Sequence, residues 1–190
     1  MVDLVAEAAR LDQFLQSLGW RFCFIGGLAV QHWGEPRLTR DLDVSLLTGF
    51  GEEASYVDAL LGVYSPRIAG ARDFALARRV LLLRSDGGVG IDVSLAALPY
   101  EELVVSRAVG VEMLPGSVVR LCSAEDLIVM KMFAGRDTDL RDLRSVIVRQ
   151  QERGLDWRHI EASLAELAEL KEDPTLLPRL RNIRDSVGRR

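Results

Sequence analysis

A chain of 190 residues has room for one domain, or for one domain with a small helical extension. Apolar residues make up 48% and charged residues 27% of the sequence, which is ordinary for a globular protein that folds without disulfides. The net charge of −4 argues against a broad nucleic-acid-binding surface, although a local basic patch is compatible with it. The sequence contains neither a run of roughly 20 apolar residues nor a signal-peptide pattern, so we expect a cytoplasmic protein without membrane contact.

The first part of the chain mixes helical and extended patterns. Apolar residues recur at helical spacing over residues 3–18, and Gly19 ends that run. The segment RFCFI at 21–25 is typical of a buried strand; Gly26 and Gly27 follow directly and lead into a short helix, LAVQHW. The remaining patterns predict a helix over 52–61 and strands over 42–47, 79–84 and 90–95, the last two joined by a Ser-Asp-Gly-Gly hairpin turn.

The second part is mainly helical. A helix is predicted over 99–107, then a weak hairpin over 109–121. Ser123 is the expected cap of a helix that ends near Gly135, and Thr138 the expected cap of a helix that runs to about residue 152. A further helix covers 156–170, and two prolines, Pro174 and Pro178, bracket a last, weaker helical stretch.

This order predicts an α+β fold, with a small mixed β-sheet flanked by helices. We assign the sheet-containing core to residues 1–122 and a helical C-terminal region, packed on that core, to residues 123–190. The two cysteines, Cys23 and Cys122, lie in apolar stretches and are expected to be buried thiols.

The segment FIGGLAVQHWGEPRLTRDLDVSL carries the chemistry. Glycines at a strand-to-helix turn let the backbone approach a ligand, and the N-terminus of the following helix favours an anion such as a triphosphate. Thirteen residues separate Gly27 from Asp41. Asp41 and Asp43 alternate along a predicted strand, so both side chains project from one face, about 6.6 Å apart.

A third acid, Asp92, lies in an apolar strand between Ile91 and Val93. If that strand neighbours the one that carries Asp41 and Asp43, the three carboxylates share a site for a divalent cation, with Mg²⁺ (or Mn²⁺) suited to carboxylates and substrate phosphates. The expected chemistry is two-metal phosphoryl transfer, with Asp92 nearest the acceptor hydroxyl as its general base.

The pattern of an apolar residue, Gly-Gly, a spacer and Asp-x-Asp resembles the signature of the polymerase-β-like nucleotidyltransferases. The wider frame, with the later SAEDLIVMKMFAGRDTDLRDL, is similar to the AbiEii/AbiGii type, which includes toxins of toxin–antitoxin systems. The resemblance covers roughly residues 20–150. This chain departs from the pattern in two ways: it has Gly-Gly where many relatives have Gly-Ser, and it is shorter than many toxins of this type.

The resemblance implies an NTP substrate and the nucleotidyltransferase fold. It places metal ligation and catalysis on Asp41, Asp43 and Asp92, and nucleotide contact on Gly26 and Gly27. A supporting or phosphate-contacting role falls to Arg37 and Thr39, and in the second motif Lys131 matches a triphosphate contact, with Arg136 and Asp139 also matching. From the residues alone, Lys131 fits equally well a side chain that extends from the core edge to solvent.

Three functions remain open at this point. The first is transfer of a nucleoside monophosphate to RNA, such as a tRNA end, or to protein by a toxin with a cognate antitoxin. The second is adenylylation of a small molecule, because aminoglycoside- and lincosamide-modifying enzymes carry a similar arrangement; the net acidity favours such a cationic substrate. The third is a non-catalytic nucleotide-binding or antitoxin-like module.

Overall fold

The computed structural model describes residues 4–187 and divides them into two compact units. Unit 1 comprises the chain up to Leu28 together with Leu38–Cys122, and unit 2 comprises Ala29–Arg37 together with the chain from Ser123. The chain thus changes unit after Cys122, while Ala29–Arg37, which the sequence analysis assigns to the first domain, groups with the C-terminal helices. No helix within residues 4–187 has the length and apolar character to cross a bilayer.

Unit 1 holds the sheet. Its first helix is predicted from residue 3, and since that residue lies outside the described range, the helix is described from Leu4. The elements of unit 1 are α1 (Leu4–Ser17), β1 (Phe22–Ile25), the start of α2 (Gly26–Trp33), β2 (Asp41–Leu47), α3 (Glu53–Leu61), β3 (Ser65–Pro66), α4 (Ala71–Arg78), β4 (Val80–Arg84), β5 (Gly90–Ala96), α5 (Pro99–Ser106), β6 (Val109–Leu114) and β7 (Ser117–Leu121).

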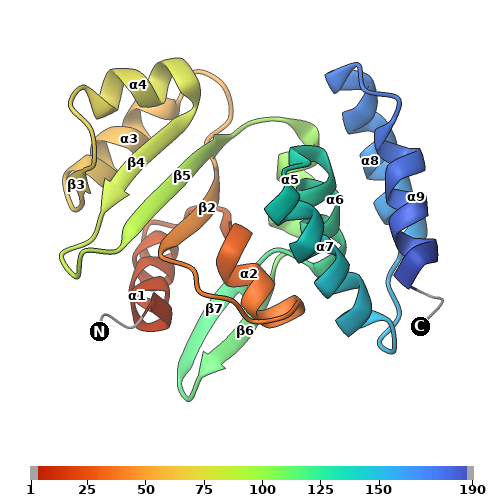
Figure 1. Cartoon of the computed structure of the whole chain (residues 1–190). Coiled ribbons are helices and arrows are strands. Elements are labelled where there is room, and N and C mark those ends of the chain that lie inside the picture. The colour runs from red at the N-terminus through yellow and green to blue at the C-terminus, as the bar shows by residue number, and fades with distance from the viewer. Residues whose placement is uncertain (1–3, 188–190) are drawn as a thin grey trace. The chain divides into compact units, whose positions relative to one another are not determined.

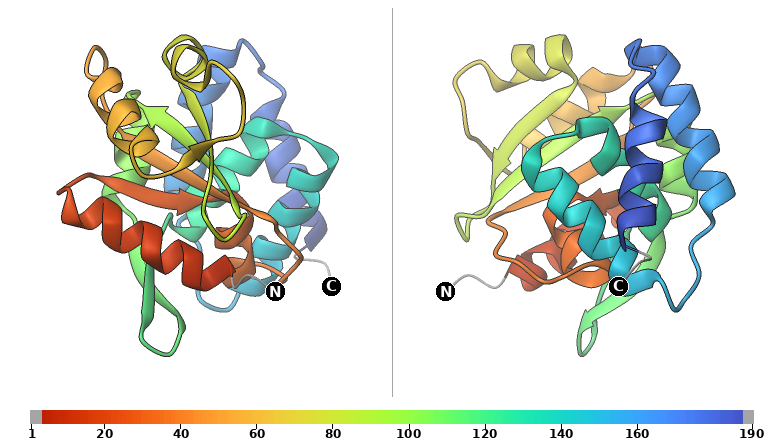
Figure 2. Two further views of the ribbon diagram at one scale, coloured as in Figure 1. Left: turned by 90° about the vertical axis from the view of Figure 1, so that its left-hand side faces the viewer. Right: turned by 45° about the vertical axis from the view of Figure 1, so that its right-hand side comes forward.

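Within residues 4–187 these strands form one seven-stranded sheet in the order β3-β4-β5-β2-β1-β7-β6 (Figure 1). The pairs β2–β5 and β1–β7 are parallel and the other neighbours are antiparallel, so the sheet is mixed. The predicted α+β class with a mixed sheet is therefore confirmed. The hairpin β6–β7, at one edge of the sheet, extends beyond the neighbouring strands (Figure 2).

Alternation along the central strands creates two different sheet faces. In β2, Leu42, Val44 and Leu46 are fully buried, whereas Asp41 and Asp43, which alternate with them along the strand, are only partly covered. The buried side chains join those of α1, α3 and α4 in one apolar cluster that also includes Leu81 and Ile91. Burial of this face stabilises the sheet and leaves the carboxylates of β2 and β5 on the opposite face.

Residues 62–78 contain elements that the sequence analysis does not predict, namely β3 and α4. Arg79, which follows α4, has a left-handed backbone with φ of +56°. Its guanidinium donates to the carbonyl oxygens of Leu95 and Gly49 at 2.8 and 2.9 Å and pairs with Glu53. Such contacts hold a non-glycine residue in this unfavourable conformation. Arg79 thereby links the end of α4 to Leu95 of β5 and to Gly49 after β2.

Unit 2 consists of the rest of α2 and the helices α6 (Ala124–Ala134), α7 (Asp137–Gln150), α8 (Trp157–Lys171) and α9 (Leu176–Val187). Figure 2 shows α7, α8 and α9 packed side by side, and their buried faces include Leu143, Leu164 and Leu180. As predicted, Ser123 caps α6: its Oγ accepts a hydrogen bond of 3.1 Å from the N–H of Asp126.

Two predictions in unit 2 are wrong. Helix α7 begins at Asp137 with Arg136 at the cap position, so Thr138 lies inside the first turn rather than capping it. Helix α9 continues beyond Pro178 to Val187. Pro178 is compatible with this because it stands in the first turn, where a backbone N–H has no partner within the helix.

Candidate functional site

Three acids converge on the open face of the sheet in unit 1. Because β2 and β5 are parallel neighbours, Asp43 stands directly opposite Asp92 in the register, and Asp41 stands opposite Gly90. The side chain of Asp41 is 50% exposed and that of Asp92 is 34% exposed, so both carboxylates are accessible to a ligand. The predicted adjacency of the two acid-bearing strands is therefore confirmed.

The absence of side chains at two glycines makes room for these acids. A Cβ on Gly26 would collide with the Asp43 carboxylate, and a Cβ on Gly90 would collide with Asp41 Oδ1. Gly26 also has a φ of +60°, which favours glycine on conformational grounds. A glycine inside a strand often marks such a close approach, so Gly90 is a site residue that the sequence analysis missed although its signal was present.

The turn between β1 and α2 connects the glycines to the acids. Ile25, the last residue of β1, pairs with Asp43 in the register, and the N–H of Gly27 donates to Asp43 Oδ2 at 3.4 Å. A Cβ on Gly27 would collide with Thr39 Oγ1, which itself donates to the Asp41 carbonyl at 3.3 Å. The predicted residues Gly26, Gly27, Thr39, Asp41, Asp43 and Asp92 thus lie together in unit 1.

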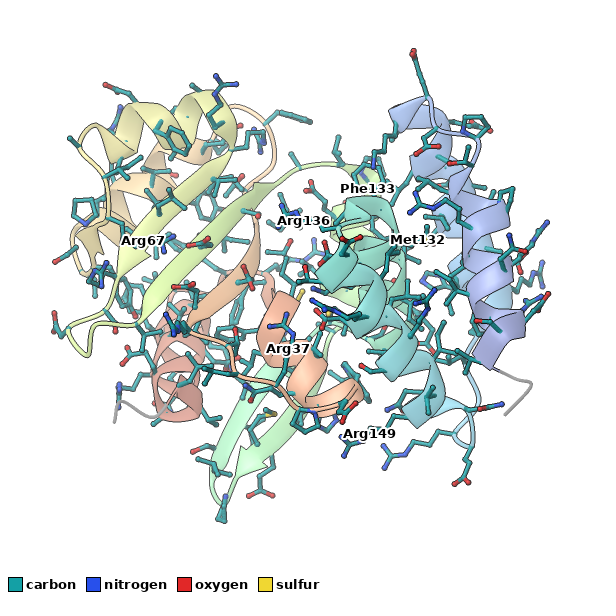
Figure 3. The ribbon with its side chains drawn as sticks, in the orientation of Figure 1. Arg37, Arg67, Met132, Phe133, Arg136 and Arg149 are labelled. Atoms are coloured by element: carbon teal, nitrogen blue, oxygen red, sulfur yellow. The ribbon has the colours of Figure 1, made fainter. Side chains whose placement is uncertain are left out.

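Arg67 brings a positive charge among the acids and was not predicted. It follows β3, and its side chain extends toward β5 in Figure 3. Its guanidinium bonds Asp92 Oδ1 through Nη2 and lies 3.5 Å from Asp41 Oδ1 through Nη1. The Nε–H is buried and finds no hydrogen-bond partner among the described residues.

The electrostatic environment of Asp92 reflects these neighbours. Burial raises the pKa of Asp92 above its ordinary value; the nearby Arg67 charge opposes that shift, and the Asp41 carboxylate adds to it. Desolvation and like charge both disfavour the ionised form of an acid. With its pKa raised, the Asp92 carboxylate accepts a proton more readily than an ordinary aspartate does.

The donor set fits a hard divalent cation. The three acids provide carboxylate oxygens, the ligands that Mg²⁺ prefers, and the Arg67 guanidinium already bonds one of them as a cation. Among residues 4–187, no three His, Cys, Asp or Glu side chains are close enough together to form a ready metal site. Binding of an ion by Asp41, Asp43 and Asp92 would therefore require their side chains to adjust.

The remaining predicted residues lie in unit 2 and form a separate charge network. The Lys131 ammonium is buried and contacts Asp139 Oδ1 at 2.7 Å and Asp142 Oδ2 at 2.9 Å. Arg37 binds the same Asp142 carboxylate through two N–H groups, each at 2.8 Å. This pairing gives Lys131 a structural role, and its contact with a triphosphate stays a prediction.

Arg37 and Arg136 both have exposed side chains, and both are labelled in Figure 3. Arg136 Nε lies 3.9 Å from Asp139 Oδ2, an oxygen that has no hydrogen-bond partner among the described residues. A surface cavity of about 380 Å³ opens beside Arg37 within unit 2; its lining residues are Glu35, Pro36, Arg37, Thr138, Arg141, Asp142 and Ser145.

The comparisons with known proteins concern the family and the fold of the chain. The model of the family described as "Nucleotidyltransferase of unknown function (DUF6036)" matches residues 1–175. No curated protein matches the chain.

Three solved structures share the fold at low sequence identity. An antigenic nucleotidyltransferase-like protein from Paracoccidioides brasiliensis is 18% identical with a TM-score of 0.57, and the match covers 92% of each chain. The lincosamide antibiotic adenylyltransferase LnuA, with lincomycin bound, is 11% identical with a TM-score of 0.52 over 74% of this chain and 94% of that one. The antibiotic-resistance factor ANT(2'')-Ia is 14% identical with a TM-score of 0.53 over 88% and 91%.

Proposed function

Because the chain belongs to the family described as nucleotidyltransferase of unknown function, DUF6036, we propose that it transfers a nucleoside monophosphate from an NTP to a hydroxyl group at the acids of β2 and β5. The observation that supports this site best is the register that sets Asp43 opposite Asp92 on parallel strands, beside the glycine turn of α2. A non-catalytic module would bind nucleotide without needing all three carboxylates.

Each group has a distinct task in this reaction. The turn at Gly26 and Gly27 and the start of α2 bind the triphosphate through backbone N–H groups and the helix dipole. The acceptor oxygen forms a bond to the α-phosphorus while the bond to the β-phosphate oxygen breaks, and pyrophosphate leaves. The hydroxyl proton passes to Asp92, whose raised pKa suits a general base.

A divalent ion, Mg²⁺ or Mn²⁺, held by Asp41, Asp43 and Asp92, would supply the positive charge that neutralises the triphosphate and the leaving pyrophosphate. Thr39 supports this arrangement, since its hydroxyl group lies against Gly27 and donates a hydrogen bond to the carbonyl oxygen of Asp41. Nucleotide contact by Arg136, in the second motif, stays a prediction.

For the acceptor we propose a small cationic molecule that carries a hydroxyl group. The net charge of −4 supports this choice, since an RNA acceptor would require a basic groove. The fold is also that of LnuA and ANT(2'')-Ia, which are an antibiotic adenylyltransferase and an antibiotic-resistance factor. The competing proposal is a toxin that modifies tRNA or protein and is restrained by an antitoxin.

The test is to incubate the protein with each α-³²P-labelled NTP and Mg²⁺, in parallel with aminoglycosides, a lincosamide, total tRNA and lysate protein. Label on a small hydroxylated cation supports the proposal, whereas label on tRNA or protein, with growth arrest on expression, supports the toxin.

Asp43→Asn is the inactive variant, and Asp86→Asn is its matched control because Asp86 is an exposed acid in the β4–β5 turn. If Asp43→Asn transfers label as fast as Asp86→Asn, the acids of β2 and β5 are not the catalytic site. If NTP binds and no acceptor is labelled in any pool, the protein is a nucleotide-binding module.

A further inference from the structure

The segment that leads into β2 has no regular secondary structure over residues 35–40, yet it carries Thr39 to the candidate site. Thr39 lies against Gly27 and donates to the Asp41 carbonyl oxygen at 3.3 Å. A segment without helix or sheet hydrogen bonds depends on other contacts for its path. The place of Thr39 therefore depends on what holds this segment.

Helix α7 holds the start of the segment. Arg149 Nη1 donates to the Gly34 carbonyl oxygen at 2.6 Å, and the N–H of Glu35 donates to Ser145 Oγ at 3.1 Å. A Cβ on Gly34 would collide with Ser145 Oγ, so the absence of a side chain allows this close approach. These contacts, all within unit 2, anchor the chain on α7 shortly before Arg37.

The ion pair of Arg37 with Asp142 completes this anchor. The Arg37 Nε–H and Nη2–H groups donate to the two Asp142 oxygens, each at 2.8 Å, and a bidentate pair fixes orientation as well as distance. The Asp142 side chain is only 5% exposed, and Lys131 contacts it at 2.9 Å. The cavity of about 380 Å³ has lining residues from both the segment and α7, so packing does not fill the space between them and the anchoring falls to the polar contacts.

The anchor and Thr39 are close along the chain. Thr39 follows Arg37 by two residues, so their Cα atoms can be at most about 7 Å apart. A shift of Arg37 is therefore passed to Thr39 through a short covalent link. An arginine whose two parallel donors are engaged by a buried carboxylate is suited to hold a chain in place rather than to bind a phosphate as a free cation.

We propose that Arg37 and Asp142 are positioning residues for nucleotide binding: the pair holds the segment before β2 so that Thr39 and Asp41 keep their places beside the glycine turn. This inference rests on the proposed function. Arg37 acts through Asp142 and does not itself contact the triphosphate, so loss of either partner weakens nucleotide binding to about the same extent.

A double-mutant cycle on binding tests this role. Isothermal titration calorimetry measures the Kd of a non-hydrolysable ATP analogue with Mg²⁺ for Arg37→Gln, Asp142→Asn and the double variant, at a temperature where all are folded. Each single variant should raise the Kd by about 10-fold, as loss of an outer-shell partner of a metal ligand does, and the double variant should bind no more weakly than either. Arg37→Lys keeps the charge without the bidentate geometry and should bind as weakly as Arg37→Gln. Arg144→Gln, which changes an exposed arginine of α7, is the control and should bind like the parent.

Hydrogen–deuterium exchange of the peptide 34–41, without nucleotide, supplies a second measurement. Exchange should be faster than in the parent for Arg37→Gln and Asp142→Asn, and unchanged for Arg144→Gln. If Asp142→Asn does not fold, Ser145→Ala takes its place, because it removes a contact of the same anchor without unpairing a buried charge; it should speed exchange and weaken binding.

A direct phosphate contact by Arg37 gives a different pattern, in which Arg37→Gln binds weakly while Asp142→Asn and Arg37→Lys bind like the parent. That pattern, unchanged exchange in both single variants, or parent-like binding by Arg37→Gln overturns the positioning role and leaves the proposed function standing. If the parent itself does not bind the analogue, the proposed function fails, and this inference fails with it.

Discussion

Arg67 Nη2 donates a hydrogen bond to Asp92 Oδ1 although strand β4 lies between the two residues. Asp41 on β2 and Asp92 on β5 are thus paired with a cation from the edge of the sheet. Removal of that cation leaves Asp41 and Asp92 to repel each other, because the pair is only partly exposed to screening water.

We therefore expect Arg67→Gln to melt about 2–4 °C below the parent in EDTA, which corresponds to about 1 kcal/mol for a chain of this length. Mg²⁺ should stabilise the variant more than it stabilises the parent, since the ion then replaces the lost charge. Thermal unfolding followed by circular dichroism, with and without Mg²⁺, measures both effects. Equal melting temperatures in EDTA would show that the guanidinium does not offset repulsion between the acids.

Asp43→Asn should reduce transfer by about 100-fold or more, since loss of even an outer-shell partner of a metal ligand costs 10–100-fold. The variant should melt no lower than the parent in EDTA, because it removes one of three neighbouring like charges. Steady-state release of pyrophosphate gives the rate, and a melting curve reports the fold. A variant that loses activity only because it unfolds would contradict this assignment.

Gly26→Ala should lower both stability and activity, because the new Cβ collides with the Asp43 carboxylate and φ is +60°. Gly116→Ala is the matched control: its φ is +77°, and no atom lies within 4 Å of the added Cβ. The control should lose only the backbone cost of about 1–2 kcal/mol for a left-handed residue. Chemical denaturation of both variants separates that cost from the collision.

Lys131→Met should destabilise the protein by about 3–5 kcal/mol, because it leaves two buried carboxylates, Asp139 and Asp142, without their shared cation. Lys171→Met is the comparison within unit 2: Lys171 is exposed and donates to the Phe133 carbonyl, so its loss should cost about 1 kcal/mol at most. Urea unfolding of the two variants tests the difference. Equal losses would show that the buried network contributes little.

The same network predicts an acid sensitivity. Burial alone would raise the pKa of Asp142, but the hydrogen bonds and charges of Arg37 and Lys131 outweigh it and hold that pKa below its ordinary value. A carboxyl group with a depressed folded pKa contributes stability above its unfolded pKa of about 3.9, and that contribution disappears as pH falls through the folded value.

Melting temperature measured between about pH 6 and pH 2 should therefore fall more steeply in the parent than in Asp142→Asn, which has no proton to gain at this position. The gap between the two curves should narrow toward the acidic end. Parallel curves over the whole range would show that Asp142 does not couple to folding.

The parts of the site that depend on local pattern could be predicted from the sequence. Alternating apolar residues place Asp41, Asp43 and Asp92 on strands, and the glycine pair marks the turn that meets them. The hairpin between β4 and β5 follows from its Ser-Asp-Gly-Gly turn, in which the Gly88 N–H donates to the Ser85 carbonyl at 2.9 Å.

Arg67 and the order of the strands could not be predicted in this way. Strand β3 has two residues, too few for a recognisable period, and the distance from Arg67 to Asp92 depends on how three strands pair. Lys131 posed the same difficulty: its sequence neighbours are apolar, while the acids that neutralise it come from the next helix. Charge partners that are distant in sequence become visible only in the folded chain.

The most direct test of the central claim is a crystal structure with Mn²⁺ and a non-hydrolysable NTP, with the ion located by its anomalous scattering. We predict an anomalous peak at the open face of β2, with carboxylate oxygens of Asp43 and Asp41 about 2.1 Å from it and the triphosphate at the Gly26–Gly27 turn. A nucleotide bound elsewhere, or an ion without any ligand from β2, would contradict the account.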